Sequence, residues 1–390
     1  MLNALSGSLT EYDLIQKIVE DTFKSKLNQM PLLATEYEVG IKSRVEALIS
    51  RLDIESNDDV HMVVMYGLGG VGKTTMARTI YNKISYQFKA KKFLENVRER
   101  SETHECIIRL QETLLYDISR NKNLEVVHNV SEGTNMIYEI LHLKRALIIL
   151  DDVDDADQIK NLLGKCDWFA PGSRIIMTTR NKQLLDILRN VSTYDYYDYE
   201  VKELDEYEAL ELFRKHAFPS NILHEDYLEL ENQVIHYAKG LPLALKVMGV
   251  DLCGRTTQEW KETLDCYEKN PHKDIQKVLK RSYKGLNKNE QIIFLDIACF
   301  FKKNDMMNYD MIKDVLEACG LNPISSIRKL IDKCLLTIDQ DKYLLMHDLL
   351  QQMGMDIVQE EAEKPEERSR LWCYEEALDV VTKNMVCMSF

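Results

Sequence analysis

Apolar runs and amphipathic stretches alternate between residues 61 and 204. The apolar runs are predicted to be strands and occupy residues 62–67, 93–97, 146–153, 174–180 and 199–204. The segments between them repeat apolar residues at helical spacing and are predicted to be helices over residues 74–85, 107–119 and 134–144. Strands that are apolar throughout and separated by helices are typical of a parallel sheet covered on both faces, so we expect an α/β domain.

The pattern becomes entirely helical after Leu204. Asp205 and Glu208 predict a capped helix start, and helical signals continue to about residue 333. Near the end, two short apolar runs flank a polar turn, with a predicted helix on each side. These four elements occupy residues 324–333, 335–339, 343–346 and 347–362. Helix, hairpin and helix in this order predict a winged-helix domain, although a hairpin inserted only for packing fits the pattern equally.

A glycine-rich loop, GLGGVGKTT at residues 67–75, connects the first predicted strand to the helix that follows it. Gly67, Gly69 and Gly72 match a dinucleotide-binding fingerprint, and Glu95 lies about twenty residues further on, as that fold requires. The same loop also matches the Walker A pattern of P-loop NTPases, in which lysine and threonine follow the last glycine.

Lys73 and Thr74 favour the Walker A interpretation. A triphosphate with Mg²⁺ needs a cation on its oxygens and a hydroxyl on the metal, whereas a dinucleotide pyrophosphate needs no lysine. An ordinary glycine turn is the alternative for the loop taken alone. The loop residues expected to contact phosphate through their backbone are Gly67, Gly69, Gly70, Val71 and Gly72.

A second phosphate-site motif is the apolar run ALIIL followed by Asp151 and Asp152. This is the form of a Walker B strand. An aspartate at the carboxyl end of such a strand can hold Mg²⁺, and its neighbour can orient an attacking water. A solvated strand end is the alternative, but both motifs in order on consecutive strands predict a nucleotide-binding domain.

Composition narrows the range of functions. With 50 Lys and Arg against 64 Asp and Glu, the chain has a formal net charge of −14, which disfavours non-specific binding to nucleic acid or anionic membrane. The nine cysteines show no short metal-binding spacing and are expected to be reduced thiols. Neither a signal peptide nor a membrane-spanning run is found, so we expect a cytoplasmic protein, with nuclear entry left open.

Further motifs follow in order along the chain. They are FLENVRE (93–99), LDDVDD (150–155), GSRIIMTTR (172–180), GLPLAL (240–245), FLDIACFF (294–301) and MHD (346–348). With the phosphate loop, this series resembles the NB-ARC nucleotide switch of plant intracellular immune receptors, in the class with an N-terminal TIR domain. Asp154 belongs to this resemblance, because the sister coiled-coil class usually has tryptophan there.

The resemblance implies a division into domains. These would be a linker helix after a TIR domain (1–35), a P-loop nucleotide-binding domain (36–204), a helical ARC1-like domain (205–284), a winged-helix ARC2-like domain (285–375) and a tail (376–390). The fold class is therefore an α/β P-loop NTPase domain followed by a helical domain and a winged-helix domain.

The resemblance also implies residue roles. On the adenine and ribose side would lie Val39, Gly40 and Ile41, with Pro242 packing on the adenine. Phosphate and Mg²⁺ would be held by Lys73, Thr74, Thr75 and Asp151, and the attacking water by Asp152. Arg180 would read the γ-phosphate, and His347 would reach the β-phosphate of ADP. Simpler interpretations are that Arg180 is a surface charge, that Pro242 only stops a helix, and that His347 is only the first residue of a helix.

The implied function is an ADP- and ATP-binding switch in plant defence and innate immune signal transduction. It would be closed with ADP, open with ATP and reset by slow hydrolysis. We expect TIR and leucine-rich-repeat domains in a longer parent, self-association in the ATP state, and no residues for TIR-type NAD cleavage in this chain. A STAND-type ATPase transcription regulator that binds DNA through its winged helix is the alternative, and a phosphotransfer enzyme is a further one. Basic residues are few between 324 and 362, which argues against DNA binding.

Overall fold

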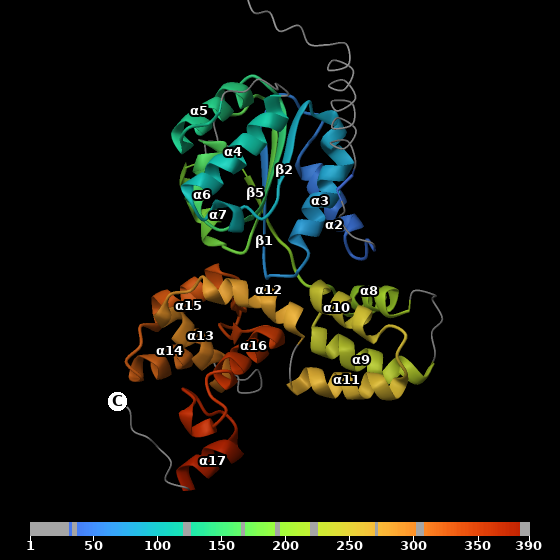
Figure 1. Cartoon of the computed structure of the whole chain (residues 1–390), viewed down its shortest axis with the longest axis vertical. Coiled ribbons are helices and arrows are strands. Elements are labelled where there is room, and N and C mark those ends of the chain that lie inside the picture. Colours follow the sequence, from blue (N-terminus) through green and yellow to red (C-terminus); the bar gives the residue numbers. More distant parts are fainter. Residues whose placement is uncertain are drawn as a thin grey trace, which may run out of the picture.

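The structure is a computed structural model, and it describes residues 31–32, 37–119, 126–164, 168–191, 196–218, 225–269, 272–301 and 308–382. Figure 1 shows a sheet domain above two helical bodies that lie beside each other. One helical body comprises residues 206–269 and the other residues 273–359. The linker helix expected at residues 1–35 falls outside the described residues, apart from positions 31 and 32.

A five-stranded parallel sheet forms the first domain, which confirms the predicted α/β class. In spatial order the strands are β2 (Ala90–Leu94), β3 (Ala146–Val153), β4 (Arg174–Thr179), β1 (His61–Tyr66) and β5 (Tyr196–Glu200). The phosphate loop follows β1, an inner strand, and Asp151 and Asp152 lie near the end of β3, with β4 between the two strands. Both motifs therefore meet at the carboxyl edge of the sheet.

Alternate residues of β1 point to opposite faces of the sheet. Val63 and Met65 belong to one apolar core, and Met62 and Val64 to the other. Helices α2 (Lys42–Arg51) and α3 (Lys73–Ile84) contribute to the first core. The second core is covered by α4 (His104–Ser119), α5 (Val130–Leu141), α6 (Ala156–Leu163) and α7 (Gln183–Val191).

The edge strands differ from their predicted positions. β2 begins at Ala90 rather than at residue 93, and β5 ends at Glu200, where the predicted run was only beginning. The reason is that an edge strand is less enclosed than a central one, so apolar residues do not mark its ends. Val201 still donates its N–H to the Tyr66 carbonyl at 2.9 Å, which keeps the segment after β5 against β1.

The first helical body contains α8 (Glu206–Ala217), α9 (Leu228–Ala238), α10 (Pro242–Leu252) and α11 (Thr257–Lys269). The predicted capping box is present: the Asp205 carboxylate accepts from the Glu208 N–H at 2.8 Å, and the Glu208 carboxylate accepts from the Asp205 N–H at 3.3 Å. Trp260 is buried at the centre of this body and packs against Phe213 and Phe218.

The second helical body contains the predicted helix, hairpin and helix. Its elements are α12 (Lys273–Lys284), α13 (Lys288–Phe300), α14 (Tyr309–Ala318), α15 (Pro323–Asp332), β6 (Thr337–Ile338), β7 (Leu344–Leu345) and α16 (Asp348–Gln359). β6 and β7 pair antiparallel, so the hairpin is confirmed, with shorter strands than predicted. A further helix, α17 (Tyr374–Thr382), includes the first residues of the predicted tail, 376–390. Short 3₁₀ turns lie at Ser85–Gln87, Glu99–Ser101, Glu225–Tyr227 and Pro365–Glu367.

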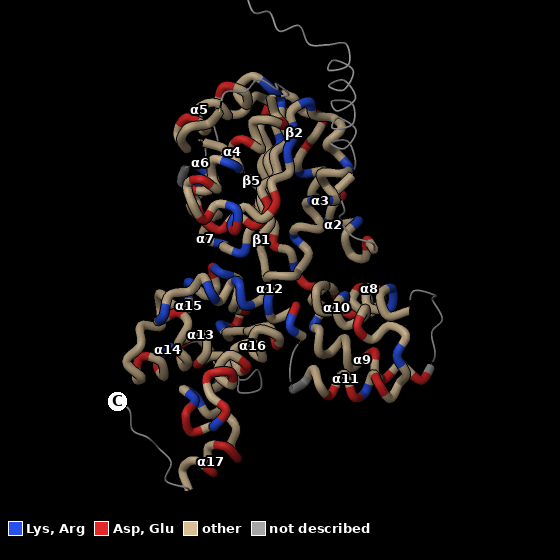
Figure 2. Tube along the Cα trace, in the orientation of Figure 1, with Lys and Arg blue, Asp and Glu red and all other residues tan. Residues whose placement is uncertain are grey.

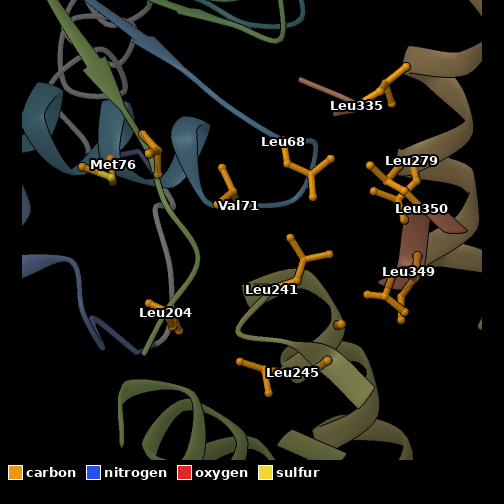
Figure 3. Close-up of a cluster of buried hydrophobic side chains, with 14 of the residues drawn as sticks. Leu68, Val71, Met76, Leu204, Leu241, Leu245, Leu279, Leu335, Leu349 and Leu350 are labelled. Carbon is orange, nitrogen blue, oxygen red and sulfur yellow. The ribbon is translucent and has the colours of Figure 1, made fainter. Parts of the chain in front are cut away.

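The three bodies share one apolar cluster. Figure 3 shows Leu68 and Val71 of the phosphate loop facing Leu241 of the first helical body. Side chains of the second helical body belong to the same cluster, namely Leu279, Leu335, Leu349 and Leu350. The phosphate loop is therefore packed by residues far from it in sequence.

We predict that Arg174→Ala destabilises the sheet domain. Arg174 is fully buried, and its guanidinium donates to the carbonyls of Asp59 at 3.0 Å, Ser173 at 2.9 Å and Ser56 at 2.8 Å. Hydrogen bonds to a charged group contribute about 1.5–3 kcal/mol, so the melting temperature should fall by roughly 6 °C or more in thermal denaturation. Arg189→Ala, at a site 57% exposed, is the control and should change it by less than about 2 °C. Equal melting temperatures for both variants would contradict this role of Arg174.

Candidate functional site

Close backbone contacts shape the phosphate loop between β1 and α3. A Cβ atom at Gly67 would lie 2.7 Å from the Val201 carbonyl oxygen, so only glycine fits there. Gly72 precedes α3 with a φ of 103°, in the left-handed region that favours glycine. The loop thus delivers the chain to the N-terminus of α3, where free backbone N–H groups and the helix dipole attract anions.

Lys73 is the first residue of α3 and is buried. Its Nζ donates to the carbonyl oxygens of Gly67 at 2.7 Å and Leu68 at 2.8 Å. Burial, together with the nearby charge of Arg180, lowers the pKa of Lys73 from 10.5 to about 8. The Lys73 ammonium therefore remains mostly charged at neutral pH. It lies against the phosphate loop, which directly precedes α3.

Asp151 is buried at the end of β3. Its Oδ1 accepts from the hydroxyls of Thr74 at 2.8 Å and Thr178 at 2.7 Å. Burial raises the pKa of Asp151, and these two hydrogen bonds oppose that rise. A threonine hydroxyl and a carboxylate side by side are oxygen ligands that suit a Mg²⁺ ion bound next to phosphate. Among the described residues, no group of three His, Cys, Asp or Glu side chains is arranged to hold a metal ion.

Asp152 and Arg180 form an ion pair beside this carboxylate. The Arg180 Nε lies 3.1 Å from Asp152 Oδ1, and both side chains are about nine-tenths buried. Arg180 also donates from Nη1 to the Val278 carbonyl of α12 at 2.9 Å. One guanidinium therefore joins the Walker B strand to the second helical body.

A cavity of about 300 Å³ opens over the phosphate loop, within the size range of small-molecule sites. Many of the predicted site residues line it: Val39, Ile41, Gly70, Val71, Gly72, Lys73, Thr74, Thr75, Asp152, Arg180 and Pro242. Five predicted residues do not line it: Gly40, Gly67, Gly69, Asp151 and His347. Of these, Asp151 lies directly behind the cavity wall, because its hydrogen-bond partners Thr74 and Thr178 both line it.

His347 is the N-cap residue of α16, one position before the helix begins. Its Nδ1 accepts a hydrogen bond from the Leu349 N–H at 3.2 Å. The adjacent Asp348 forms an ion pair with Lys239, at the end of α9, with an N···O distance of 3.5 Å. The MHD motif thus contacts the first helical body, at the connection that leads to Pro242.

Sequence reasoning missed several residues that line the cavity. Arg44 lines it while paired with Glu208 of α8 at 2.7 Å, and Lys246 lies one helical turn after Pro242, on the same face of α10. That spacing from Pro242 was a signal that could have identified Lys246. The others include Tyr37, Thr178, Leu204, Leu212, His216 and Leu243.

Backbone contacts also join the first helical body to the loop. Leu243 donates its N–H to the Gly70 carbonyl at 3.2 Å, and Leu204 donates to the Gly240 carbonyl at 2.9 Å. Figure 3 shows Leu204 and Leu241 on the two sides of this junction. The cavity is consequently walled by the sheet domain on one side and by α8 and α10 on the other.

The fold and these motifs define a P-loop nucleotide-binding protein. The family model of the NB-ARC domain matches residues 41–223, and that of the Roq1-like winged-helix domain of disease resistance proteins matches residues 287–362. The chain belongs to the NB-ARC family of plant disease resistance proteins, which confirms the resemblance found in the sequence.

Similar proteins support the assignment. The chain is 44% identical over 363 residues to the disease resistance protein RUN1 of Vitis rotundifolia, covering 93% of this chain and 26% of the relative. It is 38% identical over 390 residues to the TMV resistance protein N of Nicotiana glutinosa, covering 97% of this chain and 32% of the relative. It thus spans about a quarter to a third of these relatives.

A solved structure shares the fold. The Aeropyrum pernix ORC2 protein, determined in ADPNP and ADP complexes, has a TM-score of 0.54 and 12% identity, over 84% of this chain and 97% of that one. Within the described residues, none of the helices combines the length and apolar character needed to cross a membrane.

We predict that affinity for ADP falls as the pH rises through about 8. Only the charged form of Lys73 attracts phosphate, and its pKa of about 8 means that the charge is lost above that value. The dissociation constant should increase roughly tenfold or more between pH 7.5 and 9.5, with proton uptake on binding detectable by calorimetry in two buffers. Lys73→Ala should bind weakly with no such dependence. Constant affinity without proton uptake in the unmodified chain would contradict this prediction.

Proposed function

We propose that this chain is an ADP/ATP-dependent switch module of a plant immune receptor, closed with ADP and open with ATP. The observation that carries the proposal is the cavity itself, whose walls come from the sheet domain and from the first helical body. A ligand held by both walls would stabilise the arrangement in which they meet. Any ligand that requires a different spacing would favour another arrangement.

Arg180 supports the distinction between two nucleotides. In this structure its guanidinium is shared between Asp152 and the Val278 carbonyl of α12. A γ-phosphate would compete for the same guanidinium, whereas ADP lacks that group. Adding the γ-phosphate would therefore weaken the hold on α12, while the contacts common to both nucleotides shift nothing.

Contacts of the winged-helix domain support a closed state. Lys333 Nζ lies 2.8 Å from Asp154 Oδ1, and only 8% of the Lys333 side chain is exposed. Lys182 donates its backbone N–H to the Asp332 carbonyl at 2.5 Å. The winged-helix domain thus contacts the sheet domain beside the Walker B strand. Asp154, which the family resemblance singled out, forms the ion pair at this contact.

Hydrolysis would reset the switch. Asp152 would orient the attacking water, and Thr74 with Asp151 would hold Mg²⁺, which would neutralise charge on the phosphate oxygens when bound. Asp152 is engaged by Arg180 in this structure and would have to leave that ion pair before it could orient a water. We therefore propose a slow ATPase rather than a phosphotransfer enzyme, which would run at roughly 1–100 per second.

The parent protein belongs to the proposal as well. The relatives are three to four times longer than this chain, and we propose TIR and leucine-rich-repeat domains in a full-length parent that acts in innate immunity in the cytoplasm. The ATP state would expose surfaces that the closed form covers. We propose self-association through such surfaces.

The rival function, DNA binding through the winged helix, is less well supported. The basic residues near the end of α15 contact the sheet domain, because Lys329 donates to Gln183 at 2.5 Å and Lys333 pairs with Asp154. Arg328 also lies 4.0 Å from Asp186. Lys329 and Lys333 are thus directed toward the sheet domain rather than toward a duplex, whereas Arg328 is 77% exposed.

We predict that the purified chain retains ADP and changes shape when ATP replaces it. Chromatography of the released nucleotide should find ADP, and Lys73→Ala should lose it. Small-angle scattering should give a larger radius of gyration with a non-hydrolysable ATP analogue. His347→Asn keeps an N-cap acceptor on α16 but removes the imidazole, and it should release ADP faster, because we propose that the imidazole contacts the β-phosphate of ADP. A chain that takes up neither nucleotide, or keeps one shape with both, would end the proposal.

We predict that charge reversal between Asp154 and Lys333 opens the module. Lys333→Asp places two carboxylates together and should speed ADP release about tenfold or more, because repulsion replaces attraction between side chains that are only 8% and 21% exposed. Asp154→Lys should act similarly. The double variant should recover part of the effect, because Arg98 also lies 3.8 Å from Asp154. Arg328→Asp reverses a 77% exposed charge of α15 that lies 4.0 Å from Asp186, and it should change release far less, because exposed ion pairs contribute only about 0–1 kcal/mol. Purely additive effects in stopped-flow release would rule out this contact as the closing pair.

A further inference from the structure

We propose that Thr178 is a positioning residue that holds both Walker B aspartates in their working geometry. The inference rests on the proposed nucleotide function and extends it to a residue on the neighbouring strand. Thr178 belongs to β4, is 1% exposed as a whole residue, and lines the cavity. Its hydroxyl contacts one aspartate as a donor and the other as an acceptor.

The donor side concerns Asp151. The Thr178 hydroxyl donates to Asp151 Oδ1 at 2.7 Å, and the Thr74 hydroxyl donates to the same oxygen at 2.8 Å. A hydroxyl has one proton to donate, so Thr178 commits its only one to this carboxylate. Two donors on one oxygen restrict rotation of the carboxyl group between β4 and α3, and keep it beside the hydroxyl that would contact Mg²⁺.

The acceptor side concerns Asp152. Its backbone N–H donates to Thr178 Oγ1 at 2.8 Å. Asp152 has a φ of 57°, a left-handed conformation that is uncommon for a residue other than glycine. The register between β3 and β4 shifts between Leu150 and Val153, so the regular ladder is interrupted where the two aspartates lie. The Thr178 hydroxyl serves as hydrogen-bond partner for the backbone at this irregularity.

The consequence reaches Arg180. The left-handed turn at Asp152 directs its carboxylate to the Arg180 Nε at 3.1 Å, while Asp151 stays behind Thr74. The two carboxylates are consecutive in sequence but serve different partners, and the single hydroxyl of Thr178 holds each in its place. Without it, Asp151 would lose one of its two donors and the Asp152 N–H would lose its acceptor.

The test compares Thr178→Val, which has the same shape without the hydroxyl, with Thr178→Ser, which keeps the hydroxyl. The measured quantity is the ratio of the ADP dissociation constants in EDTA and in Mg²⁺, obtained by competition with labelled ADP. Loss of a group that orients a metal ligand typically weakens metal affinity about 10–100-fold. Thr178→Val should therefore lower the ratio about tenfold or more, and Thr178→Ser should stay within about threefold of the unmodified chain.

Thr179→Val is the matched control, because Thr179 is the next buried threonine and its hydroxyl bonds to the Val153 carbonyl at 2.6 Å. It should leave the ratio unchanged, and ADP affinity in EDTA should be similar in all variants. An unchanged ratio in Thr178→Val, or an equal loss in Thr178→Ser, would overturn the inference. An unmodified chain that binds ADP equally with and without Mg²⁺ would overturn it too. An unmodified chain that binds no ADP would instead refute the proposed function itself.

Discussion

Packing around the phosphate loop is the constraint on which the rest of the structure depends. The loop is rich in glycine and has few side chains of its own, so its apolar residues Leu68 and Val71 need partners from elsewhere. Those partners come from both helical bodies (Figure 3). The same contacts that give the loop its shape therefore also fix where the helical bodies lie. A site for phosphate and an arrangement of domains are specified together by one buried cluster.

Charge is distributed unevenly around this cluster. The chain carries a net charge of −14, yet the cavity is lined by four cations, namely Arg44, Lys73, Arg180 and Lys246. Asp152 is the only carboxylate that lines it among the described residues, and Arg180 already engages that group. Figure 2 shows acidic residues at many positions along the helical bodies, interspersed with Lys and Arg. A positively charged cavity suits a small anionic ligand. The net negative charge of the rest of the protein repels an extended polyanion such as nucleic acid.

Local patterns were sufficient for much of the fold and part of the site. The central strands, the capping box at Asp205 and the Walker motifs were predictable, because periodicity and short motifs encode them directly. Long-range pairs were not: Asp154 and Lys333 lie far apart in sequence, and each alone resembles a surface charge. Thr178 was also missed, because a strand residue with an apolar neighbourhood gives no local sign of which hydroxyl partners it meets.

Helix α12 connects these observations. Its Val278 carbonyl is held by Arg180, its Leu279 enters the shared cluster, and its Gln276 side chain is hydrogen-bonded to Asp356 of α16. The Arg98 guanidinium also binds the Arg281 carbonyl at 3.0 Å. Successive turns of α12 are thus held by residues of the sheet domain and of α16. Because a helix is stiff, a small rotation of α12 at one of these contacts would also move the others. Sequence changes in α12 would therefore alter how the bodies are held together without changing any residue that lines the cavity.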